Sequence, residues 1–158
     1  MENYTKLTDT LSSTEGSAYL TVDGQNRPGF EVSSLEATIE LVVQEKKLLG
    51  HRMTQHKVVG GKGTGSGTFY FMNSEMLNKF HSYKKNGKFP SISVQILNED
   101  PQSTIGRQNV ALRNVIFNNI PVAKVDDSSE EDPITFDSDF TFDDYDVLES
   151  FVLPENYR

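Results

Sequence analysis

The stretch from Val59 to Met72 (VGGKGTGSGTFYFM) constrains the fold more than any other part of the chain. Successive side chains of a strand point to opposite faces. As a strand, this stretch would therefore have one face with four glycines and then aromatics, at the odd positions from 61 on, and an opposite face that is mostly polar. As one strand, these 14 residues would span about 46 Å, whereas ordinary strands have about 5 to 6 residues. A strand of this length crosses a whole domain, so we expect some of its partners to come from other chains.

The glycine run does not match a phosphate-binding or nucleophile motif. A P-loop needs G-x-x-x-x-G-K followed by Ser or Thr, but Gly63 follows Lys62, and His56 stands at the first glycine. A dinucleotide fingerprint fails because Ser66 or Thr68 stands where its third glycine belongs. A nucleophile elbow fails because threonines stand two positions on either side of Ser66.

Other chemistry is equally unsupported by the residue types present. The chain has no cysteine and three histidines, and their spacing lacks the H-E-x-x-H pattern of a zinc site. A calcium loop beginning at Asp137 would need Gly and Glu at the positions of Phe142 and Leu148. We therefore expect no enzyme, no catalytic residue, no metal and no cofactor.

Charge is distributed unevenly along the chain. Residues 1–120 hold 13 basic and 11 acidic side chains (+2), and residues 121–158 hold 2 and 12 (−10), which gives the net charge of −8. Tight binding to nucleic acid requires clustered Lys and Arg, so this distribution argues against it. Neither a run of 18 apolar residues nor an apolar N-terminus is present, so we expect no membrane anchor, no signal peptide and synthesis in a cytoplasm.

Alternation with period two predicts a mainly β chain. The segment Lys46–Lys57 interrupts it and is expected to be a long projecting connection whose ends could be strands. One helix is predicted after a cap at Asn73 or Ser74, with a stripe of Met76, Leu77, Phe80 and Tyr83 and an end at Gly87. The other predicted strands are Ala18–Val22 and Phe30–Ser33 (a hairpin across Asp23-Gly24), Leu35–Val43, Phe89–Leu97, Gln108–Phe117 and Ile134–Val147.

Three segments are expected along the chain. Residues 1–17 are rich in Ser, Thr and Glu and lack periodicity, which is typical of a flexible arm. Residues 18–153 form one β domain, and residues 154–158 are a short tail.

Several of these pieces, in this order, resemble the phage-like (PBSX-type) tail tube protein family of Gram-positive contractile tails. They are Leu49–Phe71, the helix Met76–Tyr83, the strand Ser91–Leu97 and the acidic stretch Phe136–Tyr145, and the resemblance runs from about Gly16 to Phe151. It implies a β-sandwich or barrel of the Hcp-like type with one flanking α-helix. It also implies that six copies form a hexameric ring and that rings stack into a hollow tube lined by long strands.

The resemblance also implies partners and a location. The partners are further copies of the chain, a contractile sheath protein, a baseplate or tube initiator and a tape-measure protein, with DNA passing through without binding in a true phage. The protein is then made and assembled in the bacterial cytoplasm as part of a virion tail or a bacteriocin (tailocin) particle.

Three sets of residues receive roles from this resemblance and the strand patterns. Ring-to-ring contact is expected at Leu48, Leu49, His51, Arg52, Met53, His56 and Lys57. The intersubunit barrel strand is expected to carry Gly61, Gly63, Gly65, Gly67, Phe69 and Phe71, its glycines allowing close approach. The channel is expected to be lined by the face of Lys62, Thr64, Ser66 and Thr68 or by that of Asp137, Asp139 and Asp143.

Some alternatives stay open at this stage. A ring-forming tube or effector carrier of a type VI-like secretion system has a similar fold, and a ligand-binding β-barrel or hydrolase is a third class. The acidic strand face is also explained by solubility and by protection of a sheet edge. The residues do not distinguish an infectious phage, a defective prophage and a DNA-free bacteriocin.

Overall fold

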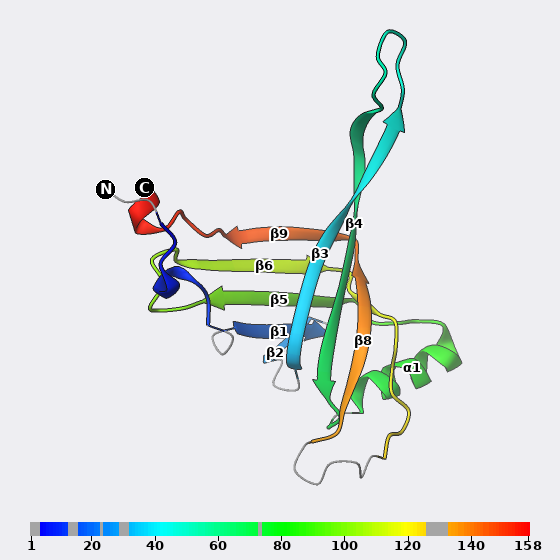
Figure 1. Cartoon of the computed structure of the whole chain (residues 1–158). Helices are drawn as coiled ribbons and strands as arrows, with labels where there is room; N and C mark the ends of the chain where they lie inside the picture. The colour runs from blue at the N-terminus through cyan, green and yellow to red at the C-terminus, as the bar shows by residue number, and fades with distance from the viewer. Residues whose placement is uncertain (1–3, 13–15, 23, 29–31, 73, 126–132) are drawn as a thin grey trace.

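Two antiparallel sheets cross each other and share one core (Figure 1). The computed structural model describes residues 4–12, 16–22, 24–28, 32–72, 74–125 and 133–158. The five-stranded sheet has the order β2-β1-β5-β6-β9, with β1 Gly16–Val22, β2 Gln25–Pro28, β5 Ile92–Glu99, β6 Arg107–Arg113 and β9 Asp144–Glu149. The four-stranded sheet has the order β3-β4-β8-β7, with β3 Val32–Lys46, β4 Gln55–Tyr70, β8 Thr135–Phe142 and β7 Ile116–Phe117. With the helix α1, Glu75–Asn86, this confirms the expected mainly β fold with one helix.

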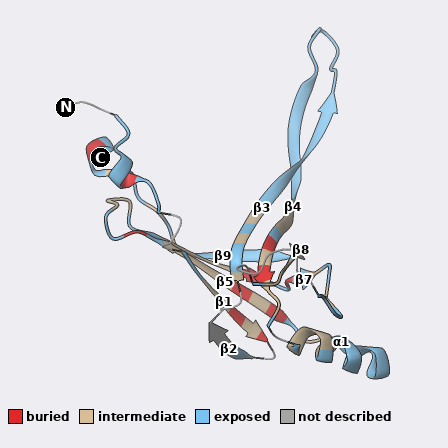
Figure 2. Cartoon of the chain, turned by 60° about the horizontal axis from the view of Figure 1, so that its bottom comes forward, coloured by how far each residue is buried: buried red, intermediate tan, exposed pale blue. Residues whose placement is uncertain are grey.

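The core lies where the two sheets cross, and it occupies only part of the chain (Figure 2). Its apolar side chains come from β1, β5, β6 and β8, with Val115 between β6 and β7. The β3–β4 hairpin and most of α1 extend away from this region and are exposed (Figure 2). The buried members of the core are Leu20, Val22, Ile92, Val94, Leu112, Val115, Phe140 and Phe142.

Glycines of β4 make room for phenyl rings of β8. Gly63 pairs with Phe142 across the strands, and Gly65 pairs with Phe140. A Cβ on Gly65 would lie 2.2 Å from Cζ of Phe140 and 2.5 Å from the backbone oxygen of Glu36, and one on Gly63 would lie 2.5 Å from the Phe142 ring. Ordinary contact begins near 3.4 Å, so a methyl group at either position would overlap its neighbours. The rings pack on bare backbone, as the expected close approach at these glycines requires.

The long strand β4 has partners within the chain on one side along its length and on the other side over its second half. β3 pairs with it along nearly its whole length, and β8 pairs with residues 63–70 on its other side. Because β3 is equally long, the two strands extend beyond the core as a self-paired ribbon (Figure 1). That other chains supply further partners of β4 stays a prediction.

The ends of this hairpin also differ from the predicted ones. β3 continues to Lys46 and β4 begins at Gln55 instead of Val59, so the connection predicted over 46–57 shortens to residues 47–54. The paired ends are polar and solvated on both faces, so no alternation of apolar residues marks them as strands. The suggestion that the ends of the connection are strands is confirmed.

Two predicted strands are each divided between the two sheets. The segment Gln108–Phe117 breaks at Asn114, where φ is 51°, into β6 and β7. The segment Ile134–Val147 breaks at Asp143 into β8 and β9. The two corners meet, because the Asp143 N–H donates to the Arg113 carbonyl at 3.1 Å and the Asn114 side chain donates to the Asp143 carboxylate.

Two other predicted strands need smaller corrections. β1 forms its hairpin with β2 instead of with Phe30–Ser33, of which residues 30 and 31 lie outside the described part. β5 begins at Ile92, three residues after the predicted start at Phe89. The strand starts later because Pro90, just after the predicted start, has no N–H to donate to a strand ladder.

The helix agrees with its predicted bounds, although the Ser74 side chain makes no capping hydrogen bond, Asn73 lies outside the described residues, and the apolar stripe is only half covered. It begins after Ser74 and ends before Gly87, where φ is 74° and the N–H donates to the Tyr83 carbonyl at 2.7 Å. Met76 packs on the core, whereas Phe80 and Tyr83 are exposed and pack on each other with ring centroids 5.8 Å apart.

Both ends of the chain are tied to the loop between β5 and β6 by polar contacts. The buried Asp9 carboxylate accepts from the Thr104 N–H at 3.1 Å and from its hydroxyl at 2.6 Å. The Glu155 N–H donates to the same hydroxyl at 3.0 Å, and the Asn156 amide donates to the Tyr4 carbonyl at 2.5 Å. The described part of the expected flexible arm is thus in contact with the domain. The boundaries 1–17, 18–153 and 154–158 stay a prediction.

We expect Gly65→Ala to lower the free energy of unfolding by about 1–3 kcal/mol, because its methyl group would overlap Phe140 and a backbone oxygen. Gly60→Ala is the matched control on the same strand, since nothing lies within 4 Å of its added Cβ, and it should change stability by less than about 0.5 kcal/mol. Urea unfolding measures both. Equal effects at the two positions would contradict this packing.

Asp9→Asn should destabilise the protein at neutral pH, with an effect that fades in acid. The hydrogen bonds from the Thr104 side chain and backbone hold the pKa of Asp9 below its ordinary value of 3.8. The charged form therefore contributes stability in full above pH 3.8, and this is lost as the pH falls through the lowered pKa. Urea unfolding of both proteins from pH 7 down to pH 3 should show their difference shrinking, and a difference that grows in acid would contradict it.

Candidate assembly surface

The side of the four-stranded sheet that faces away from the core carries hydroxyl and carboxylate side chains. Ser66 pairs with Glu36 on one side and Asp139 on the other, and the Thr68 hydroxyl donates to the Asp137 carboxylate at 2.7 Å. We call this the outer face. It comprises Ser34, Glu36, Thr38 and Glu40 of β3, Lys62, Thr64, Ser66 and Thr68 of β4, and Asp137, Asp139 and Thr141 of β8.

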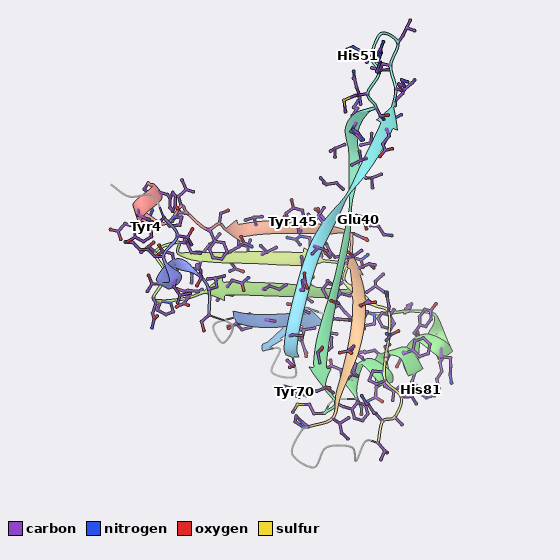
Figure 3. The ribbon with its side chains drawn as sticks, in the orientation of Figure 1. Tyr4, Glu40, His51, Tyr70, His81 and Tyr145 are labelled. Carbon is purple, nitrogen blue, oxygen red and sulfur yellow. The ribbon has the colours of Figure 1, made fainter. Side chains whose placement is uncertain are left out.

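The two rows that the sequence offered as alternative channel linings lie side by side on this one surface. Asp143 is the exception, because it stands at the corner between β8 and β9. The outer face has four carboxylates against the single Lys62, a net charge of −3. It is therefore a polar, negatively charged surface over the part of the sheet where β3, β4 and β8 lie together, and Glu40 stands at its end nearer the tip (Figure 3).

Sequence reasoning gave no role to the β3 row of this face. The signal was present, since Glu36, Thr38 and Glu40 alternate with apolar residues in the same way as the β4 row. What the local pattern lacks is the register that places Thr38 opposite Thr64 and Glu40 opposite Lys62.

The opposite side of the hairpin continues the apolar face of the core beyond the point where the core ends. Leu35 and Ala37 pack against the core, but Ile39, Leu41 and Val43 further along β3 are exposed, Leu41 by 59%. We call these last three residues the apolar strip. Next to its base, a groove of about 510 Å³ runs between β3 and the five-stranded sheet, with Val110, Tyr145 and Val147 on its other wall.

The hairpin tip, residues 47–54, presents apolar side chains to solvent. The His51 N–H donates to the Leu48 carbonyl at 3.2 Å and Gly50 has φ of 88°, which is the geometry of a type II turn. Leu49 is fully exposed at the apex of this turn, and Met53 is 81% exposed. Five of the seven residues predicted for ring-to-ring contact lie in the tip, and His56 and Lys57 follow in β4.

One edge of the four-stranded sheet is open, and the other is partly covered. In the described part of the chain, β3 pairs with β4 alone. On the other side, β7 pairs with β8 at Phe140 and Thr141, and the Asn118 N–H donates to the Asp139 carbonyl at 2.8 Å, so that β8 is uncovered mainly before residue 138. Open edges of long strands are templates for pairing with another chain.

The glycine row expected in an intersubunit barrel faces the core of its own chain. Gly67 and Phe69 are buried, and β4 lies between β3 and β8 along the second half of its length. Phe71 follows the end of β4, where its N–H donates to the Ile134 carbonyl at 2.9 Å. A role of this strand in a barrel shared between copies stays a prediction. The backbone without a strand partner in the described part belongs to β3 and to the part of β8 before residue 138.

The described residues offer no clustered chemistry. Within the ranges given above, no three His, Asp or Glu side chains gather as candidate metal ligands. Nor does any helix in those ranges have the length and apolarity needed to cross a membrane.

Comparisons with known proteins agree on one family. Residues 3–149 match the profile of a family described as phage tail tube protein. The phage-like element PBSX protein XkdM of Bacillus subtilis (strain 168) is 34% identical over 144 residues, covering 91% of this chain and 94% of the relative.

Solved structures of contractile particles share the fold at low sequence identity. One is the tube-terminating cap of the anti-feeding prophage, with a TM-score of 0.66 and 10% identity, covering 95% of this chain and 96% of that one. Another comes from the sheath-tube complex of an extracellular contractile injection system, with a TM-score of 0.60 and 12% identity, covering 84% and 88%.

We expect Leu41→Ser to weaken self-association and to leave the single chain nearly unchanged. Leu41 is exposed in the single chain, and covering a leucine is worth about 1.5–3 kcal/mol, about tenfold or more in affinity. Val42→Ser is the matched control, because Val42 is similarly exposed but lies on the other face of the same strand. Sedimentation velocity compares the association. An equal loss in both variants would contradict a role for the apolar strip.

Proposed function

The chain belongs to the phage tail tube protein family, and on that premise we propose that it is the subunit of the inner tube of a contractile tail or tail-like particle. Six copies close into a ring, and rings stack into a hollow tube. Its role is structural and not enzymatic. It is assembled in the bacterial cytoplasm, with a sheath protein, a baseplate or tube initiator and a tape-measure protein as its further partners.

The observation that carries this proposal is the surface that the single chain leaves uncovered. The chain exposes 11507 Å², whereas a compact monomer of 17.8 kDa exposes about 8000 Å². The projecting hairpin contributes to this excess, because its apolar strip and tip are in water. An isolated chain gains nothing from such a ribbon, but an assembly gains every contact it makes with a neighbour.

Ring closure would use the open edge of β3 and the part of β8 before residue 138, which β7 leaves uncovered. Pairing the β3 edge of one copy with the β8 edge of the next is a heterologous contact, and such contacts form a closed ring when the rotation between copies divides a full turn. Closing the ring removes both open edges. The same contact brings neighbouring chains over the apolar strip and the groove at its base.

The outer face is the surface we assign to the channel. In a barrel built from these sheets, one side of β3, β4 and β8 turns inward, and the outer face is the side without apolar residues up to Glu40. Its net charge of −3 per copy, from four carboxylates and Lys62, repels a polyanion. DNA would then pass along hydroxyls and carboxylates without finding the lysines and arginines that retain it.

Negative-stain microscopy with sedimentation velocity at increasing protein concentration tests the proposal. We expect six-fold rings that give way to tubes as the concentration rises. Rings that never stack would favour a carrier of the type VI-like class. A protein that stays monomeric at millimolar concentration would contradict the proposed function.

A further inference from the structure

A small apolar pocket lies at the end of the hairpin strands opposite to the tip. It has a volume of about 70 Å³ and is formed where β4 and β8 reach the start of α1 and the segment 119–121. A water molecule needs about 10–15 Å³ on this measure, so the pocket has room for one aliphatic side chain. Its lining includes Tyr70, Met76, Leu77, Ile120, Pro121 and Phe136.

The tip and this pocket are complementary in character. The tip presents Leu49 fully exposed at the apex of a turn, where the hydrogen bond from His51 to Leu48 fixes the direction of the chain. Nothing in the described part of the same chain covers that side chain. Leu49 has four side-chain carbons, a size that suits the volume of the pocket.

The tip and the pocket lie at opposite ends of the same hairpin, so a contact between them joins two copies head to tail. His51 in the tip and Tyr70 at the pocket lie at opposite ends of the hairpin (Figure 3). From Gln55 to Tyr70, β4 rises about 50 Å, so a tip cannot reach the pocket of its own chain. A second copy placed ahead of the first along these strands brings its pocket to the first copy's tip.

The geometry points to this pocket as the receptor for Leu49 of a copy in the adjacent ring, so that the tip of one ring fastens the next. The inference rests on the proposed function and names the two surfaces of the stacking contact. It is a head-to-tail contact that leaves one free tip and one free pocket at the two ends of any stack, and such contacts build filaments without a fixed length. Covering Leu49 supplies the driving force, because burying a leucine removes apolar surface from water.

Disulfide trapping tests the contact directly, because the chain has no cysteine of its own. Leu49→Cys and Leu77→Cys proteins are mixed, assembled and oxidised mildly, and we expect a disulfide dimer that forms only in tubes. Leu49→Cys mixed with Tyr83→Cys is the control, since Tyr83 is exposed on the same helix but away from the pocket. Equal trapping at positions 77 and 83, or no trapping in tubes, would overturn the inference.

Substitutions at the tip give a second readout that does not depend on the pocket variant folding. Leu49→Asp should keep the monomer's urea midpoint and the ring but reduce tube formation at least tenfold, and Leu49→Met should restore tubes. If Leu49→Asp assembles like the unmodified protein, another surface joins the rings, and the inference fails while the proposed function stands. If the unmodified protein forms no rings or tubes, the proposed function and this inference fail together.

Discussion

The packing of the Phe140 and Phe142 rings on the bare backbone of Gly65 and Gly63 is the contact on which the rest of the structure depends. It brings β4 and β8 together without side chains between them, and it lets two phenyl rings fill the space where the sheets cross. Because side chains alternate along a strand, glycines on the core side leave the hydroxyls and lysine of β4 on the other side. One packing constraint therefore creates both the core and the polar outer face.

The sequence predicts the elements that follow a simple period and misses those that depend on contacts between distant residues. The alternation in β3, β4, β5 and β8 and the capped helix α1 were visible in the residues. The corners at Asn114 and Asp143 were not visible. Both sheets face one core, so the alternation of inward and outward residues continues when the chain passes from one sheet to the other. The contact between Asp9 and Thr104 joins residues 95 positions apart, so no local pattern indicates it.

The candidate assembly surface was predicted in pieces and not as a whole. The β4 row and the Asp137 row were recognised separately, and the register of β4 against β8 joins them into one face. The tip residues were placed correctly in a projecting connection. The exposed apolar strip on β3, which leads up to the tip, was not predicted. Val43 and Val58 pair in a ribbon with no core beneath it, and only the structure shows that the ribbon extends so far. A chain that exposes this much apolar surface has a stability that depends on its concentration, because association covers what folding leaves open.

The tube proposed here depends on two features: the β3 edge of one copy joins the uncovered part of β8 in the next copy, and the outer face turns inward. A helical cryo-EM reconstruction of the assembled tube, at a resolution that shows side chains, measures this most directly. We expect backbone pairing between the β3 edge of one copy and the uncovered part of β8 in the next, with Glu36 and Asp139 facing the channel. A tube in which these edges stay unpaired and both carboxylates face outward would contradict it.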